Sequence, residues 1–319
     1  MSMWLALAAV LAGLAILTLG GEALVRGAAG LALRFGLTPA VIGLTVVAFG
    51  TSSPELAVSI DAARAGLDGI AVGNVVGSNI ANVALICGIA ALVRPLVVEA
   101  RLVRVDIPLM LAASVAVAAL LLVGGGIGRL AGALLVAALV AWIAWRIVVV
   151  RRESDAVRDE FGAGIDTILA FPLGQIALIV LGIGTLALGA TLLVNGATVI
   201  ARGLGLTPAV IGLTVVAVGT SLPELATSVV AARRNQGDIA VGNIVGSNLF
   251  NLLAILGLTA LVLPLSRAEV TVIDLGVMLA TSAALWAILW RGVRVGRVAG
   301  ALLLASWLVY MGWLLLVQP

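Results

Sequence analysis

The sequence has no lysine, no histidine and a single cysteine. One cysteine excludes a framework of internal disulfides, and Cys87, which lies in an apolar stretch, is expected to be a small core residue. Without histidine or lysine, a serine has no ordinary base to activate it, so hydrolysis by a serine nucleophile is disfavoured. Zinc and copper prefer nitrogen and sulfur ligands, which this chain almost entirely lacks.

Charged residues are also scarce. They make up 10% of the 319 residues, against 63% hydrophobic residues, and mean hydropathy is +1.27. Soluble domains carry roughly a quarter charged residues, so the chain is expected to be an integral membrane protein. The net charge of +3 comes from arginines that lie toward the ends of apolar runs. This pattern indicates membrane orientation and not binding of nucleic acid.

The apolar runs predict an all-helical protein with about ten transmembrane helices, at roughly 20 residues per crossing. The first run is longer than a bilayer requires, which favours a tilted helix. The expected spans are residues 3 to beyond 20, 39–63, 70–93, 103–123, 128–150, 174–201, 208–232, 239–262, 270–290 and 298–317.

An internal repeat organises the chain. Residues 36–55 read GLTPAVIGLTVVAFGTSSPE, and residues 205–224 read GLTPAVIGLTVVAVGTSLPE. The match continues at a constant offset of 169 through two motif blocks, 36–95 and 205–264. We expect a first five-helix repeat in residues 1–150, a short connecting loop in 151–170 and a second five-helix repeat in 171–319.

Five spans per repeat is an odd number, so the second repeat should cross the membrane upside down. With both termini and the even-numbered links on one side, that side holds four arginines and the other holds fourteen. Because arginine concentrates in the cytoplasm, this predicts external termini and a cytoplasmic 151–170 loop. Inverted repeats with interrupted helices, here helices 2, 3, 7 and 8, are typical of secondary transporters.

Each motif carries an acidic residue inside an apolar run, which is by default a functional-site hypothesis. Glu55 follows Pro54, and Glu224 follows Pro223. Proline removes one helical hydrogen bond, which should free backbone carbonyls at 48–51 and 217–220. Carbonyls cannot stay bare in hydrocarbon, so a bound cation could satisfy them. The alternative is a plain proline kink that a neighbouring serine or threonine stabilises.

Further oxygen atoms surround each glutamate in the sequence. Hydroxyls lie three and four residues before it, and the next helix carries a polar stripe at spacings of four. An all-oxygen set suits hard cations, whether one divalent ion, two or more monovalent ions, or protons. For Asn74 and Asn243, hydrogen bonding between helices at close-packed glycines is an alternative that stays open. The stripes are Asn74, Ser78, Asn82 and Asn243, Ser247, Asn251.

With these motifs, the chain resembles the calcium/cation antiporter superfamily, and most closely prokaryotic sodium/calcium exchangers. The resemblance covers essentially the whole chain. It implies that the long first and sixth helices slide across the other eight. It also implies calcium bound by Glu55 and Glu224 with the carbonyls of Thr51 and Thr220. Sodium sites and the central level would use Thr51, Ser52, Ser78 and Ala48, then Thr220, Ser221, Ser247 and Ala217, with Asn82 and Asn251.

The chain departs from this pattern at Asn251, where many members carry aspartate. The departure leaves the ion stoichiometry, and sodium against proton coupling, open. The expected function is exchange of Ca²⁺ for Na⁺, in the direction of calcium export across the plasma (inner) membrane. The alternatives are H⁺/Ca²⁺ exchange, a passive cation channel, and the disfavoured hydrolase with Ser52 or Ser221. We expect no enzymatic activity, no cofactor and no obligatory protein partner besides the lipid bilayer. The short loop excludes the calcium-sensing domains of animal relatives.

Overall fold

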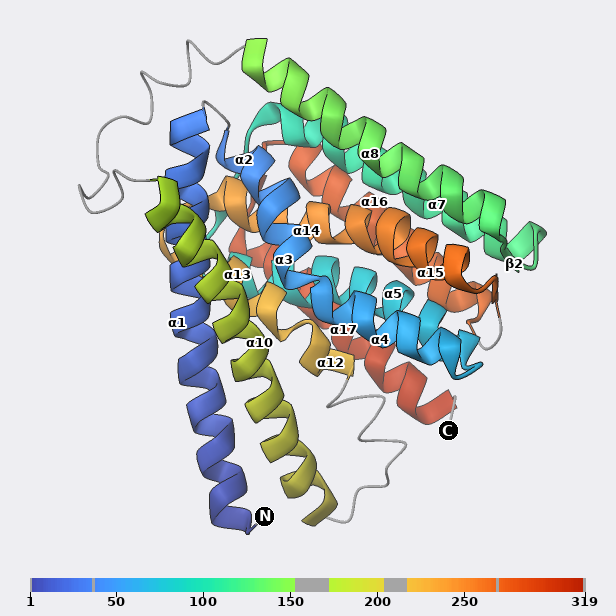
Figure 1. The fold of residues 1–319 in the computed structure, drawn as a ribbon, viewed down its shortest axis with the longest axis horizontal. Helices are drawn as coiled ribbons and strands as arrows, with labels where there is room; N and C mark the ends of the chain where they lie inside the picture. The colour runs from blue at the N-terminus through green and yellow to red at the C-terminus, as the bar shows by residue number, and fades with distance from the viewer. Residues whose placement is uncertain (1, 36–37, 153–171, 204–216, 268–269, 318–319) are drawn as a thin grey trace.

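The computed structural model describes residues 2–35, 38–152, 172–203, 217–267 and 270–317, and nearly all of them are helical (Figure 1). The helical elements of the first half are α1 (Met3–Phe35), α2 (Pro39–Ile42), η1 (Gly43–Val47), α3 (Ala48–Thr51), α4 (Ser53–Arg64), α5 (Asp68–Ile80), η2 (Ala81–Ile86), α6 (Cys87–Val93), η3 (Leu102–Asp106), α7 (Ile107–Val123) and α8 (Arg129–Arg152). Those of the second half are α10 (Pro172–Gly203), α12 (Ala217–Thr220), α13 (Leu222–Arg233), α14 (Gly237–Leu249), η6 (Phe250–Ile255), α15 (Leu256–Val262), α16 (Val272–Trp290) and α17 (Arg297–Val317).

The predicted membrane fold is confirmed. Within the described residues, eight helices are long and apolar enough to cross a bilayer, and the bent pair of residues 39–51 and 53–64 makes a ninth. The expected tenth span includes α12 and α13, which repeat α3 and α4. Its expected beginning at 208–216 lies outside the described residues.

The longest helices, α1 and α10, run side by side along one flank of the molecule (Figure 1). They cross through glycines, as membrane helices often do. A Cβ on Gly13 would lie 2.8 Å from the carbonyl oxygen of Gly189, and one on Gly20 would lie 3.1 Å from that of Gly182. The offset of 169 relates Gly13 to Gly182 and Gly20 to Gly189. Each of these two glycines therefore packs against the equivalent of the other, so α1 and α10 are antiparallel, as inverted repeats require.

In the part of the chain that the structure describes, four π-helical segments interrupt the helices, and the sequence did not predict them. The segments η2 and η6 begin at equivalent positions in the third and eighth spans. These two spans are therefore interrupted by a wide turn and not by a break, whereas the second span bends by 46° between Thr51 and Ser53. Such π-turns recur at functional sites.

Two short antiparallel pairs of strands tie the links between spans together. The strand β1 (Leu96–Val97) pairs with β4 (Arg294–Val295), and β2 (Gly126–Ile127) pairs with β3 (Leu265–Ser266). Leu96 and Leu265 are equivalent at the offset of 169. Their partners, Val295 and Ile127, are equivalent at 168, so one residue is missing from the second half between these strands.

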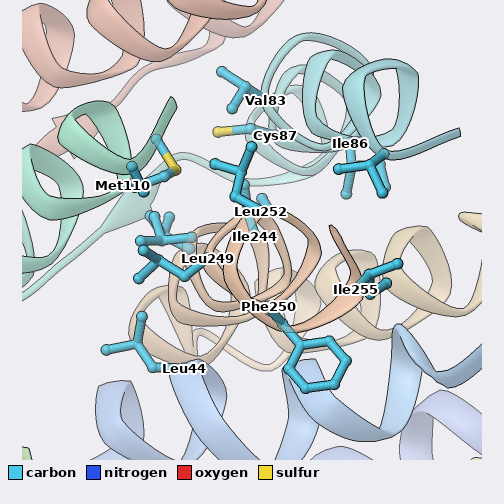
Figure 2. Packing of buried hydrophobic residues seen from close by; sticks show 14 of the residues in the cluster. Leu44, Val83, Ile86, Cys87, Met110, Ile244, Leu249, Phe250, Leu252 and Ile255 are labelled. Atoms are coloured by element: carbon cyan, nitrogen blue, oxygen red, sulfur yellow. The ribbon is translucent and has the colours of Figure 1, made fainter. Parts of the chain in front are cut away.

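The core surrounds η2 and η6, whose apolar side chains face one another (Figure 2). Val83 of η2 and Leu252 of η6 are fully buried beside Met110 of α7 and Cys87 of α6. The prediction that Cys87 is a small core residue is thus confirmed. Close packing of this kind, rather than exclusion from water, holds helices together in lipid. It fixes the positions of the polar residues one turn away.

Candidate cation-binding site

The two helix breaks share one backbone conformation, which orients the two glutamates. Ser52 has φ −87° and ψ 6°, and Ser221 has φ −89° and ψ 7°, so both break residues adopt one conformation. The following proline lies in the first turn of α4 or α13, where its missing N–H costs little. Glu55 and Glu224 then occupy the first turn of these helices, where the helix dipole stabilises negative charge.

The break does not leave every carbonyl free. The Ala48 carbonyl oxygen accepts from the Ser52 backbone N–H at 3.0 Å and from the Thr51 hydroxyl at 3.3 Å. The Phe49 carbonyl accepts from the Ser53 hydroxyl at 2.8 Å. The expectation of bare carbonyls therefore needs correction at Ala48, because hydroxyl and amide donors next to the bend already satisfy it. Ala217 and Thr220 are the first and last residues of α12, the equivalent of α3.

The two glutamates are buried, each 1% exposed, and their hydrogen bonds cross between the halves. The Ser52 hydroxyl donates to Glu224 Oε1 at 2.8 Å, and the Ser221 hydroxyl lies 3.4 Å from Glu55 Oε1. Each carboxylate is thus held by the serine of the other repeat. This arrangement places Glu55 and Glu224 at a shared centre.

Asn74 and Asn243 support the glutamate backbones. The Asn74 side-chain amide donates to the Glu55 carbonyl at 3.2 Å, and that of Asn243 donates to the Glu224 carbonyl at 3.4 Å. The same amides also donate to a serine one turn later, Ser59 or Ser228, at 3.0 and 3.1 Å. Hydrogen bonding between helices, the alternative left open for this pair, is what the structure shows.

The remaining residues of the stripes lie at the same centre. The Ser78 and Ser221 hydroxyls are 3.5 Å apart, and Ser247 lies beside Glu224. Asn82 and Asn251 follow Ser78 and Ser247 by one helical turn, and each is 1% exposed. The structure thus gathers hydroxyl, amide and carboxylate oxygens from the second, third, seventh and eighth spans.

Four of these oxygen atoms, on the two glutamates and on two asparagines, are buried without a hydrogen-bond partner, and an amide oxygen or an ionised carboxylate can only accept. An unsatisfied buried acceptor costs about 1–3 kcal/mol, and more if it is charged. A hard cation is the group that satisfies several such acceptors at once. The four atoms are Glu55 Oε2, Glu224 Oε2, Asn82 Oδ1 and Asn251 Oδ1.

Sequence reasoning missed four polar residues near the site. Ser59 and Ser228 support the amides described above, and Asn248 and Asn79 accept hydrogen bonds from Asn82 and Asn251. All four recur at the offset of 169, so the repeat itself held the signal. Ser59 and Ser228 lie one turn after the glutamates, and Asn79 and Asn248 lie next to the serines of the stripes, but none of the four belongs to a stripe.

One arginine assigned to the cytoplasmic surface is instead buried. Arg146 is 1% exposed, and its Nη2 lies 3.2 Å from Asp106 Oδ2. The Trp142 indole N–H also donates to Asp106 at 3.3 Å. An arginine at the end of an apolar run resembles a surface anchor, and only the packing of α8 against the preceding helices shows that this one is internal.

Taken together, the fold and the site define an integral membrane protein of two inverted repeats with a buried, all-oxygen centre between them. The pattern of the family described as "Sodium/calcium exchanger protein" matches residues 5–148 and 174–316. The chain belongs to this family, whose members are transporters and not enzymes.

Individual proteins are similar to this chain over nearly its whole length. The Escherichia coli inner membrane protein YrbG is 37% identical over 330 positions, covering 99% of both chains. The putative antiporter CaxA of Alkalimonas amylolytica is 36% identical, covering 94% of this chain and 96% of its own length. A solved structure of the sodium-calcium exchanger NCX_Mj is 30% identical, covers 98% of this chain and all of its own, and superimposes with a TM-score of 0.84. The predicted resemblance is therefore confirmed.

Proposed function

We propose that the chain exchanges Ca²⁺ for Na⁺ by alternating access and exports calcium from the cell. Family membership supports exchange of a cation for calcium. The observation that carries the proposal further is the set of four unpartnered oxygens, two of which belong to Glu55 and Glu224. Calcium takes six to eight oxygen ligands, and carboxylates are prominent among them.

In this proposal the twelve residues predicted from the sequence act as one site. Glu55 and Glu224 bind calcium together, because two buried carboxylates are stabilised by one divalent ion between them. Sodium ions compete for the same charges through the neighbouring hydroxyls. The ligands are Thr51, Ser52, Ser78, Asn82 and Ala48 from the first half, and Thr220, Ser221, Ser247, Asn251 and Ala217 from the second. The Ala48 carbonyl would bind sodium in place of the Thr51 hydroxyl from which it accepts.

The counter-ion is the finer part of the proposal, with H⁺ as the second candidate. One observation favours considering protons: Asn251 contributes a neutral amide, so the described site holds two carboxylates and no third. The measurement is uptake of calcium-45 into proteoliposomes that carry a sodium, potassium or proton gradient in turn. Sodium-driven uptake supports the proposal, and uptake driven by protons alone would replace it. Flux that persists without any counter-ion would indicate a channel.

The orientation is proposed from the arginine distribution, with both termini outside and residues 151–170 in the cytoplasm of a plasma (inner) membrane. The relative YrbG is named an inner membrane protein. Because the only cysteine is buried, single cysteines can be introduced without a second reactive thiol. A cysteine in place of Ser2 should react with an impermeant maleimide on intact cells, and one in place of Ser154 should react only after lysis. The opposite result would reverse the orientation.

A further inference from the structure

Four buried asparagines interlock across the interface of the two repeats. The Asn82 Nδ2 donates to Asn248 Oδ1 at 2.9 Å, and the Asn251 Nδ2 donates to Asn79 Oδ1 at 3.0 Å. Each is at most 1% exposed. Every one of these bonds joins a residue of one half to a residue of the other.

The bonds decide which end of each carboxamide faces away from its partner. An asparagine side chain has a donor end and an acceptor end, and only the oxygen can bind a cation. Because Asn82 and Asn251 use their nitrogens on Asn248 and Asn79, their oxygens are the ends left without a partner. A half-turn of either carboxamide would present N–H groups in place of that oxygen.

The two accepting asparagines, Asn79 and Asn248 (the holders), are themselves fixed by backbone carbonyls. The Asn79 Nδ2 lies 3.5 Å from the Asn248 carbonyl oxygen, and the Asn248 Nδ2 lies 3.3 Å from the Asn79 carbonyl oxygen. A backbone carbonyl inside a helix cannot turn over, so it keeps the Nδ2 of each holder oriented toward it. The opposite end, Oδ1, must then face Asn251 or Asn82.

We propose that Asn79 and Asn248 are positioning residues of the cation site, which hold the oxygens of Asn251 and Asn82 toward the ion. The proposal rests on the proposed exchange of calcium and deepens it. It adds two residues that do not touch the ion. It also assigns each ligand amide a holder from the opposite repeat.

The same geometry bears on the choice of asparagine at position 251. An aspartate there would set a carboxylate oxygen against Asn79 Oδ1, so two acceptors would meet. Turning Asn79 over would relieve this contact, but it would then set Asn79 Oδ1 against the Asn248 carbonyl. The orientation of Asn79 in this chain therefore matches a neutral amide at position 251.

The test removes a holder and then replaces the ligand amide by a carboxylate, which accepts at both ends and needs no holder. We expect Asn79→Leu to raise the KM for Ca²⁺ about tenfold, at about 1.4 kcal/mol per factor of ten, with little change in kcat. Adding Asn251→Asp should bring KM back to within about threefold of the Asn251→Asp single variant. The assay is calcium-45 exchange in proteoliposomes, with melting temperature as the control for folding.

The crossed combinations are the matched controls. Asn82→Asp should fail to rescue Asn79→Leu and should rescue Asn248→Leu, because the holders act across the repeats. If a leucine variant is not recovered folded, alanine replaces it in the same design. A normal KM in Asn79→Leu, or equal rescue by both aspartates, would overturn the positioning role alone. Failure of the wild-type chain to exchange calcium at all would overturn the proposed function and this inference with it.

Discussion

The two halves of the chain agree closely at the centre and differ toward the membrane surfaces. At the centre, the break residues Ser52 and Ser221 share one backbone conformation, and the serine and asparagine bonds recur in pairs. Away from the centre, Asp106 pairs with Arg146 and Glu22 pairs with Arg234, whereas the positions equivalent to Arg146 and Glu22 hold Leu314 and Thr191. If the halves exchanged conformations during transport, identical halves would make the two access states equal in free energy. The residues that differ are therefore those that can favour one state.

A buried acid shows how one position diverges. Asp106 and Asp274 are equivalent at the offset of 168, and each accepts from an aromatic donor, Trp142 or Tyr310, at 3.3 and 2.7 Å. Asp106 additionally pairs with Arg146. Asp274 instead forms a capping box with Thr271 at the start of α16. The same acid is thus balanced by a charge in one half and by hydroxyl and backbone donors in the other.

The largest effect is expected where the halves agree. Glu55→Gln and Glu224→Gln should each reduce calcium exchange by two orders of magnitude or more, because each removes one of the two carboxylates that balance the charge of the bound ion. Both variants should remain folded, since glutamine keeps the shape. Asp61→Asn, an exposed change of the same charge on the same helix, is the control. Near-normal exchange in either glutamine variant would refute the shared site.

The second prediction breaks the ion pair found in the first half. Arg146→Leu, which installs the residue of the second half (Leu314 at the offset of 168), should destabilise the protein by about 3–5 kcal/mol by leaving Asp106 buried and uncompensated. The additional change Asp106→Asn should recover most of this loss. Melting temperature in detergent measures both. If the single variant is as stable as wild type, the Asp106 charge is balanced elsewhere.

The third prediction makes the centre less symmetric. Asn251→Asp adds a charge to the second half alone, so the charge moved per cycle should change. Moving one charge is worth about 2.3 kcal/mol per 100 mV, which should alter the voltage dependence of exchange. Currents or potential-driven uptake in proteoliposomes measure this, with Asn82→Asp as the counterpart in the first half. No response to potential in either variant would indicate electroneutral exchange.

The fourth prediction concerns pH and one membrane face. The Glu99 backbone N–H donates to Asp238 Oδ1, which ties the link after α6 to the start of α14. Burial, and then the charge of Asp238, raise the pKa of Glu99 from 4.5 to about 7, while the Thr38 hydroxyl and the Arg146 guanidinium lower it. The folded protein therefore holds this proton more tightly than the unfolded chain. The contribution of Glu99 to the free energy of unfolding should be largest below about pH 4.5, fall as pH rises to about 7, and level off above it.

Glu99→Gln keeps the shape of the protonated acid and should flatten this slope. Melting temperatures between pH 5 and 8 provide the comparison. At the opposite face, Asp68 accepts from the Ser266 hydroxyl and N–H at 2.9 and 3.0 Å, in a tie of the same kind. Ser266→Ala weakens that tie without removing an acid, so it should leave the slope intact. A slope that persists in Glu99→Gln would assign the titration to another group.

Much of the fold and of the candidate site could be predicted from the sequence, because each motif occurs twice. The repeat located the helix breaks, the paired glutamates and the inverted halves. It could not predict the π-helical turns, since a wide turn leaves no mark on an apolar pattern. Nor did it predict that Ser52 would bond to Glu224 rather than to Glu55. Contacts across the interface depend on how the halves meet, and local spacing holds no information on that.

The smallest effect is expected at an ion pair that has no equivalent in the other half. Glu22 of α1 accepts from Arg26 at 2.9 Å and from the Arg234 Nε, at the end of α13, also at 2.9 Å. The equivalent residues are Thr191, Asn195 and Ala65, which cannot form such a tie. The ion pair thus links α1 to the other helices in the state described here, and it should favour that state over the alternative.

Glu22→Gln should therefore change the apparent calcium affinity in opposite directions from the two sides of the membrane. The side chain is partly exposed, at 32%, and such ion pairs contribute about 0–1 kcal/mol, so the change should not exceed about fivefold. It should shrink at high ionic strength, where exposed charges are screened. Thr191→Ala removes the equivalent side chain of the second half and should change neither affinity. Equal changes from both sides would mean that the tie alters the site and not the balance between access states.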